Sequence, residues 1–141
     1  MVLLLRMLAG SRLYGTQHEN SDYDFYEVHD KCKPFHSAHG PSGDLTRWPL
    51  SQLMRIADKG GHNALQLLFA DHAWCEVDLL QEFRESYVAN PWNCYPRFKK
   101  VAEQYRDKGT DKGLTYATMF EDWMGQLWTT GRFNPHWRNN A

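Results

Sequence analysis

The hydrophobic periodicity of this chain changes at Pro49, and the change limits the folds that the chain can adopt. Before Pro49, short apolar runs fit β-strands at residues 1–8, 23–28 and 44–48, and residues 31–43 fit a loop or a poorly formed hairpin. After it, Leu50, Leu53 and Ala57 recur at helical spacing, and two glycines at 60–61 end that segment. Further helices are predicted at residues 63–69, 77–87, 97–106 and 114–128. In the last of these, a stripe is predicted to face the core: Ala117, Phe120, Met124, Leu127 and Trp128.

This division predicts an α+β fold, with an alternative of a small α/β sheet that carries helices. A chain of 141 residues is long enough for one compact core and short for two. We therefore expect a single domain over residues 1–141, with a strand-rich core at 1–48 and a mainly helical part at 49–141.

Cysteine usage and hydropathy predict a cytoplasmic protein. The three cysteines, Cys32, Cys75 and Cys94, are odd in number and widely spaced, which is unlike a disulfide framework. The apolar segment at residues 1–8 is short and is interrupted by Arg6, so it fits a buried strand better than a signal peptide. No apolar run approaches the roughly 20 residues that span a bilayer, and no membrane partner is expected. The many aromatic residues suggest self-association into a homo-oligomer.

Two short motifs carry the chemical signal, and they lie between the first two predicted strands. The first is Gly10-Ser11-x3-Gly15, and the second is Ser21-Asp22-x-Asp24. On extended backbone, side chains two residues apart project from the same face, so Asp22 and Asp24 are expected side by side. Paired carboxylates repel each other unless a cation lies between them, and oxygen ligands of this kind suit Mg²⁺ or Mn²⁺.

The glycine-serine motif predicts a site for phosphate groups beside that metal. Backbone N–H groups at a turn into a helix bind anions, and the helix dipole is expected to assist. Ser11 can donate to a terminal phosphate, Arg12 can hold its charge, and Gly15 permits a turn that a larger residue would strain. Metal, phosphate and positioned donors together are the components of phosphoryl transfer.

The segment from Gly10 to Gly15, followed by Ser21-Asp22-Tyr23-Asp24, resembles the signature of polymerase-beta-superfamily nucleotidyltransferases, in particular predicted ones associated with RNA repair in bacteria and phages. The resemblance implies a small nucleotidyltransferase sheet and transfer of a nucleoside monophosphate from a nucleoside triphosphate to a hydroxyl acceptor. It implies that Asp22 and Asp24 bind metal, and that a third acid comes from a neighbouring strand. We assign that role to Asp44, which we expect to ligate one metal and to help deprotonate the attacking hydroxyl, with Glu27 and Asp30 as alternatives. It also implies that Gly10 and Ser11 hold the triphosphate, and we add Arg12, Gly15 and Ser21 as predicted nucleotide-binding residues.

The same resemblance covers later segments less specifically, and it leaves the acceptor open. Residues 44–53, 61–69 and 112–133 are similar to the third strand and later helices of that family. Tyr116 and Met119 depart from it, because more polar side chains are expected there. The acceptor can be an RNA end, a protein hydroxyl or a small molecule.

Three rival interpretations remain open at the level of sequence. The group His29, Cys32, His36 and His39 has the residue types of a zinc site, although its spacing is not standard. Basic residues interleaved with aromatics can bind RNA or form a solvated helix face; they are Arg97, Lys99, Lys100, Arg106, Lys108, Lys112 and Arg132. Finally, the domain can be a catalytically inactive nucleotide-binding or antitoxin-like interaction module.

Overall fold

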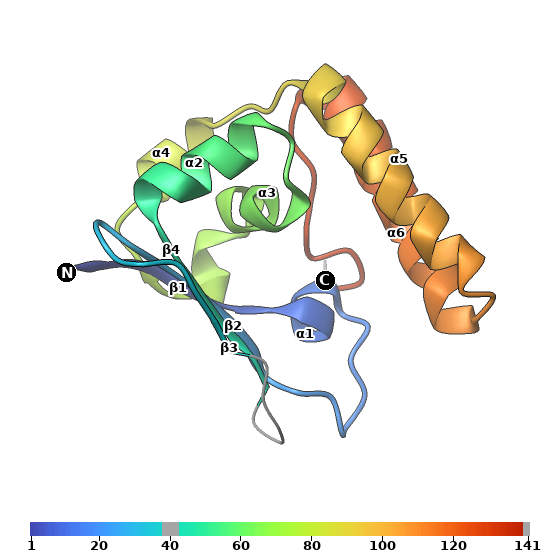
Figure 1. Ribbon diagram of the computed structural model, residues 1–141, viewed down its shortest axis with the longest axis horizontal. Coiled ribbons are helices and arrows are strands. Elements are labelled where there is room, and N and C mark those ends of the chain that lie inside the picture. Colours follow the sequence, from blue (N-terminus) through green and yellow to red (C-terminus); the bar gives the residue numbers. More distant parts are fainter. Residues whose placement is uncertain (38–42, 140–141) are drawn as a thin grey trace.

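The computed structural model describes residues 1–37 and 43–139 and shows an α+β domain in two layers (Figure 1). A mixed five-stranded sheet has the order β3-β4-β2-β1-β5. Its strands are β1 (Leu3–Ala9), β2 (Asp24–His29), β3 (Phe35–Ser37), β4 (Leu45–Pro49) and β5 (Cys75–Asp78). Only the β2/β4 pair is parallel among the strand pairs of the described residues; β1 pairs antiparallel with β2 and β5, and β3 pairs antiparallel with β4.

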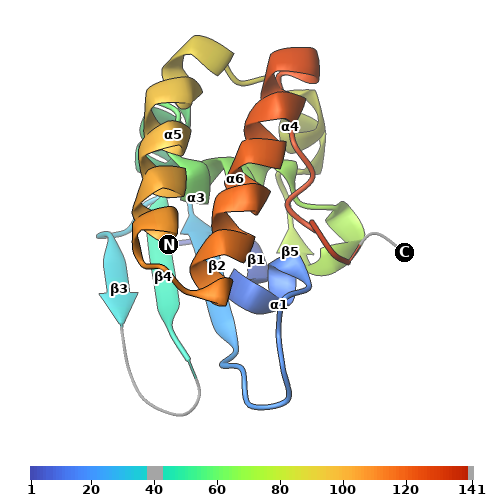
Figure 2. The same ribbon diagram turned by 90° about the vertical axis from the view of Figure 1, so that its right-hand side faces the viewer.

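Helices cover one face of the sheet and extend beyond its edge. They are α1 (Gly10–Tyr14), α2 (Leu50–Asp58), α3 (His62–Phe69), α4 (Gln81–Ser86), α5 (Pro91–Asp107) and α6 (Asp111–Thr130). Helices α2, α3 and α4 lie over the sheet, whereas α5 and α6 form a long antiparallel hairpin beside them (Figures 1 and 2). None of the helices in the described ranges is long and apolar enough to cross a membrane.

The core joins the helix-covered face of the sheet to α3 and to the hairpin. Leu5, Met7 and Val28 project from the strands and are fully buried. Behind α3, aromatic rings of the hairpin pack edge to face, with Phe120 and Trp123 centroids 5.1 Å apart. The Trp123 ring also stacks on Phe133 at 4.5 Å, so the segment after α6 belongs to the same core.

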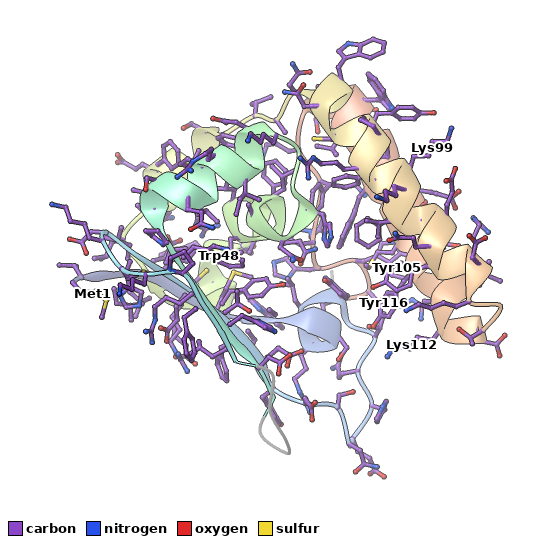
Figure 3. All side chains as sticks on the ribbon, in the orientation of Figure 1. Met1, Trp48, Lys99, Tyr105, Lys112 and Tyr116 are labelled. Carbon is purple, nitrogen blue, oxygen red and sulfur yellow. The ribbon has the colours of Figure 1, made fainter. Side chains whose placement is uncertain are left out.

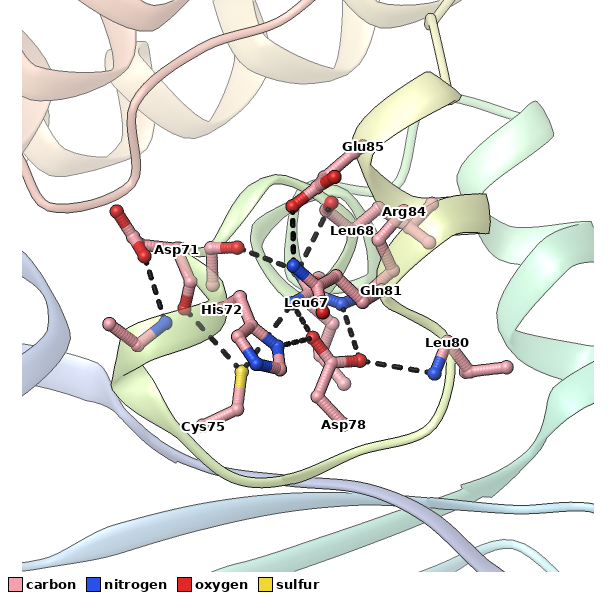
Figure 4. Close-up of polar contacts among 12 residues, drawn as sticks. Leu67, Leu68, Asp71, His72, Cys75, Asp78, Leu80, Gln81, Arg84 and Glu85 are labelled. Carbon is pink, nitrogen blue, oxygen red and sulfur yellow. Dashed lines mark hydrogen bonds and ion pairs between the residues drawn. The ribbon is translucent and has the colours of Figure 1, made fainter.

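A buried arginine joins α4 to the end of α3 (Figure 4). Arg84 is 1 % exposed and forms an ion pair with Asp78, the last residue of β5. Its Nη1 donates to the carbonyl oxygens of Leu67 at 3.0 Å and Ala70 at 2.6 Å, at the C-terminal end of α3 where such oxygens lack helical partners. This cluster is structural, since every polar group of the guanidinium is used within it.

Three sequence predictions are wrong in detail. The predicted helix at 77–87 is divided, because residues 75–78 pair with the edge of β1 and only Gln81–Ser86 is helical. Helix α5 begins at Pro91 instead of residue 97, because the Asn90 side chain accepts a hydrogen bond from Trp92 N and proline is favourable at the first helical position. Trp128 does not face the core but is 43 % exposed.

Candidate active site

The first motif forms a sharp turn at the end of β1. Ala9 is the last residue of β1, and Gly10 begins α1 with φ +66°, a left-handed conformation that side chains with a Cβ rarely adopt. The turn into a helix that the sequence predicts is confirmed. The helix has only five residues, however, so its dipole is small and an anion here would depend on individual N–H groups and on Ser11.

Asp24 lies directly against this turn. It is paired with Ala9 across β1 and β2. Its Oδ2 lies 2.6 Å from the position that a Cβ on Gly10 would occupy, so only a glycine leaves room for the carboxylate. Its Oδ1 accepts a hydrogen bond of 3.0 Å from Asp44 N. The Asp24 side chain is therefore fixed between the Gly10 turn and the residue that precedes β4.

Asp44 reaches this position through the parallel pairing of β2 and β4. Its carbonyl oxygen accepts from Phe25 N at 2.8 Å, and Phe25 is paired with Leu45. Gly43 has φ +98°, and a Cβ there would lie 2.4 Å from the Tyr23 carbonyl oxygen, so the two chains approach closely. The structure thus places Asp44 directly before the neighbouring strand β4 and beside Asp24, where the resemblance implies a third acid.

Two adjacent cavities open on either side of Asp24 and share it and Gly10. One, of about 420 Å³, is lined also by Ser11, Asp22 and Ser21. The other, of about 300 Å³, is lined also by Asp44, His36, Thr46 and Asn63. Asp24 therefore belongs to both cavities, whereas Asp22 lines only the larger one and Asp44 only the smaller one.

The loop between the two motifs is held by Arg12. Its Nη2 donates to the Ser21 carbonyl oxygen at 2.9 Å and its Nε to that of Asp22 at 3.3 Å, while the guanidinium lies 3.6 Å from the Tyr23 ring centroid. In turn, Ser21 Oγ accepts from His18 N at 2.9 Å. In this arrangement Arg12 and Ser21 position the loop that carries Asp22, and β2 begins only at Asp24.

The hairpin supplies a wall of the 420 Å³ cavity that the motifs do not indicate. Tyr105, Lys112 and Tyr116 line it together with Tyr14. In Figure 3, Tyr105 and Tyr116 lie on the side of the hairpin that faces α1, with Lys112 nearby. Tyr116 Oη lies 3.1 Å from Thr16 Oγ1, which ties α6 to the loop. Lys112 brings a cation to the acidic cavity; in the sequence it is only one of several basic residues.

The tyrosines beside the acids stay protonated at neutral pH. Burial, reinforced by the negative charge of Asp24, raises the pKa of Tyr26, whose hydroxyl donates to Asn63 Oδ1 at 3.1 Å. Burial likewise raises the pKa of Tyr14, which donates to Gln66 Oε1 at 3.0 Å. Both hydroxyls are therefore neutral hydrogen-bond donors.

Residues 138–139, which are distant in sequence, contact the C-terminal end of α1. Arg138 N donates to the Tyr14 carbonyl oxygen at 2.7 Å, and Asn139 Nδ2 donates to those of Arg12 at 2.7 Å and Leu13 at 3.3 Å. These oxygens lie at the C-terminal end of α1 and would otherwise lack partners. Gly15 fits this contact, because a Cβ on it would lie 2.7 Å from the Arg138 carbonyl carbon.

The alternative third acids lie elsewhere. Glu27 is 8 % exposed and forms ion pairs with Arg6 and Arg47. It is three residues from Asp24 along β2, so it projects from the opposite face of the sheet. Asp30 is at the other end of β2, where its carboxylate accepts from Val2 N at 2.7 Å.

The predicted zinc group is not assembled by its described members. His29 Nε2 is bonded to Glu27 at 3.2 Å, and His36 Nδ1 to Thr46 at 2.8 Å. His39 lies outside the described residues. Over residues 1–37 and 43–139, no three His, Cys, Asp or Glu side chains are grouped closely enough to hold one metal ion.

The carboxylates still fit Mg²⁺ or Mn²⁺ as pairs. Asp22 and Asp24 share one cavity, and Asp24 and Asp44 share the other. Mg²⁺ in phosphoryl-transfer sites is held by one or two carboxylates, with phosphate oxygens and water completing its shell. The number of carboxylates that line each cavity matches that requirement.

Comparisons of the chain with protein-family models, with curated proteins and with solved structures found no match.

Proposed function

We propose that this domain is a metal-dependent nucleotidyltransferase that moves a nucleoside monophosphate from a nucleoside triphosphate to a hydroxyl acceptor. The observation that carries the proposal is the position of Asp24, which is fixed against Gly10 on one side and by Asp44 N on the other. The cavities that meet at Asp24 offer space for two substrates. The resemblance of the Gly10–Asp24 segment to polymerase-beta-superfamily nucleotidyltransferases supports the same reaction.

The triphosphate belongs in the 420 Å³ cavity, since this cavity combines the Gly10-Ser11 turn with Lys112. Ser11 donates a hydrogen bond to a phosphate oxygen, and Lys112 offsets negative charge. Tyr105 and Tyr116 offer ring surface to the nucleoside. Asp22 and Asp24 would hold Mg²⁺ or Mn²⁺, which when bound stabilises charge on the reacting phosphate oxygens.

The acceptor belongs in the 300 Å³ cavity beside Asp44. Its hydroxyl oxygen forms a bond to the α-phosphorus while the bond from that phosphorus to the β-phosphate bridging oxygen breaks. Pyrophosphate leaves, and the hydroxyl proton passes to the Asp44 carboxylate. Asn63 and Thr46 provide hydrogen-bonding groups that orient the acceptor in this cavity. An RNA end is one acceptor of suitable chemistry, and a protein hydroxyl or a small molecule is another.

The test is transfer of label from each α-labelled nucleoside triphosphate, with Mg²⁺ or Mn²⁺, to total RNA and protein extracts. Asp24→Asn keeps an oxygen that can accept from Asp44 N but removes the charge, so we expect transfer to fall by about 100-fold or more. We expect a similar fall in transfer for Asp44→Asn. Asp107→Asn, on the exposed surface of α5, is the matched control and should retain activity.

Equal transfer by wild type and Asp24→Asn would refute the proposal. Metal-dependent triphosphate binding without transfer by a folded wild type would instead identify an inactive nucleotide-binding or antitoxin-like interaction module.

A further inference from the structure

The open end of the α5/α6 hairpin, where α5 begins and α6 ends, exposes aromatic rings that have little cover from the rest of the described chain. Trp92, Trp128 and Tyr95 are 75 %, 43 % and 43 % exposed. The two tryptophan rings meet edge to face at 4.8 Å, and the Tyr95 ring lies 6.1 Å from that of Trp128. Clusters of large exposed aromatic side chains mark binding surfaces, whereas single exposed ones are normal on a monomeric protein. We call Trp92, Tyr95, Lys99 and Trp128 the hairpin surface.

A groove runs from this surface between the two helices. It has a volume of about 490 Å³, with Tyr95, Lys99 and Trp128 on its rims and Phe98 and Met124 below. Trp92, Tyr95 and Lys99 are spaced three and four residues apart, so they follow one face of α5. Lys99 projects outward from the hairpin, away from the side on which Tyr105 and Tyr116 lie (Figure 3). The surface is therefore separate from the candidate active site.

The charge at this end of the hairpin is positive. Residues 91–102 contain Arg97, Lys99 and Lys100 and no acidic residue, and residues 123–139 also contain no acidic residue. Farther along the groove, Glu103 and Glu121 also line it, and Glu121 pairs with Arg106. Lys99 Nζ lies 5.9 Å from the Tyr95 ring centroid, so cation and ring are presented together.

We propose that the hairpin surface binds single-stranded nucleic acid, with bases stacked on Trp92, Tyr95 and Trp128 and phosphates near Lys99. Stacking on aromatic rings next to cations is how proteins hold single strands without reading their sequence. Single-stranded nucleic acid supplies both flat rings and negative charge, whereas the same positively charged surface of a second copy supplies rings without negative charge. The proposal goes beyond nucleotidyl transfer and does not depend on it.

Binding is measured without triphosphate or metal, so failure of catalysis does not affect the result. A fluorescein-labelled single-stranded oligouridylate of roughly 12 nucleotides is titrated with protein at about 50 mM salt, and its anisotropy is recorded. We expect Trp92→Ala to weaken binding by about five- to a hundredfold, and Trp92→Phe to restore most of it. Lys99→Gln should make the slope of log K against log salt shallower by about 0.7.

Two controls match these changes on other surfaces. Phe83→Ala removes an exposed aromatic ring of α4, and Lys33→Gln removes an exposed cation near β3. Both should bind as the wild type does. The proposal is overturned if the wild type does not bind, or if the hairpin variants bind as tightly as the controls. It is also overturned if sedimentation shows a dimer that Trp92→Ala dissociates while RNA binding is unchanged, because the face would then join two copies.

Discussion

Replacing Gly10 by alanine tests whether the Asp24 carboxylate depends on the turn beside it. Gly10 has φ +66°, and an added Cβ would lie 2.6 Å from Asp24 Oδ2. Gly109 is a matched control, since it has φ +65° and no atom of the described residues lies within 4 Å of the position that a Cβ would take there. Both alanines carry the same backbone penalty, and only the one at position 10 meets the carboxylate.

The expected magnitudes follow from these two environments. A left-handed alanine costs about 1–2 kcal/mol, which is partly offset by about 0.4–1 kcal/mol from the restricted unfolded chain. Gly109→Ala should therefore lose roughly 1 kcal/mol, or a few degrees in Tm. Gly10→Ala must also displace Asp24 from Asp44 N, and a hydrogen bond to a charged group contributes about 1.5–3 kcal/mol. Its total loss should be about 2–4 kcal/mol.

The assay combines thermal denaturation, followed by circular dichroism, with calorimetric titration of metal and triphosphate. Gly10→Ala should lose metal-dependent triphosphate binding, whereas Gly109→Ala should retain it. If the two variants lose equal stability and both still bind, the contact between Gly10 and Asp24 has no energetic consequence and our account of the site is refuted.

Two further predictions concern the scaffold. Arg84→Met leaves the Asp78 carboxylate buried without the Arg84 cation, and we expect it to lower the free energy of unfolding in urea by about 3–5 kcal/mol. The double variant Arg84→Met/Asp78→Leu should recover part of that loss. An Arg84→Met variant as stable as the wild type would contradict this expectation. Burial lowers the pKa of His62 to about 4, so the unfolded chain, with a histidine pKa near 6.5, binds more protons between these values. Stability attributable to His62 is present above pH 6.5 and is lost as pH falls toward 4, by about 3 kcal/mol in all, and His62→Gln should remove this component from the pH profile of unfolding free energy. An unchanged profile would show that His62 does not titrate in this window.

Local sequence patterns predict the elements whose signals are local. The apolar run before Gly10, the glycine turn and the helix that begins after Pro49 all depend on neighbouring residues, and the structure has them. The last residues of the strand Cys75–Asp78 are wrongly predicted as helix. Local patterns miss this strand because it depends on pairing with β1, some 70 residues earlier in the chain.

The residues of the candidate site also include some whose positions follow from local sequence and others whose positions depend on distant contacts. Spacing alone predicts that Gly10, Asp22 and Asp24 lie together, and the resemblance adds Asp44. In the structure Gly10 and Asp24 line both cavities, whereas Asp22 lines only one of them and Asp44 only the other. Lys112 and Tyr116 could not be placed there from sequence, because only the packing of the hairpin brings them to the cavity. Arg12 is expected to bind a phosphate, but its guanidinium instead donates hydrogen bonds to carbonyl oxygens of the adjacent loop.

The clasp on α1 by Arg138 and Asn139 also makes this short helix depend on a distant part of the chain. The groups that satisfy the last carbonyl oxygens of α1 lie more than 120 residues after them. Such distant contacts are entropically costly to close and form late in folding. Within this domain, α1 gains these partners only when residues 138–139 have packed against it. We expect removal of residues 138–139 to leave the carbonyl oxygens of Arg12, Leu13 and Tyr14 without these donors, and so to loosen the helix that follows the Gly10 turn.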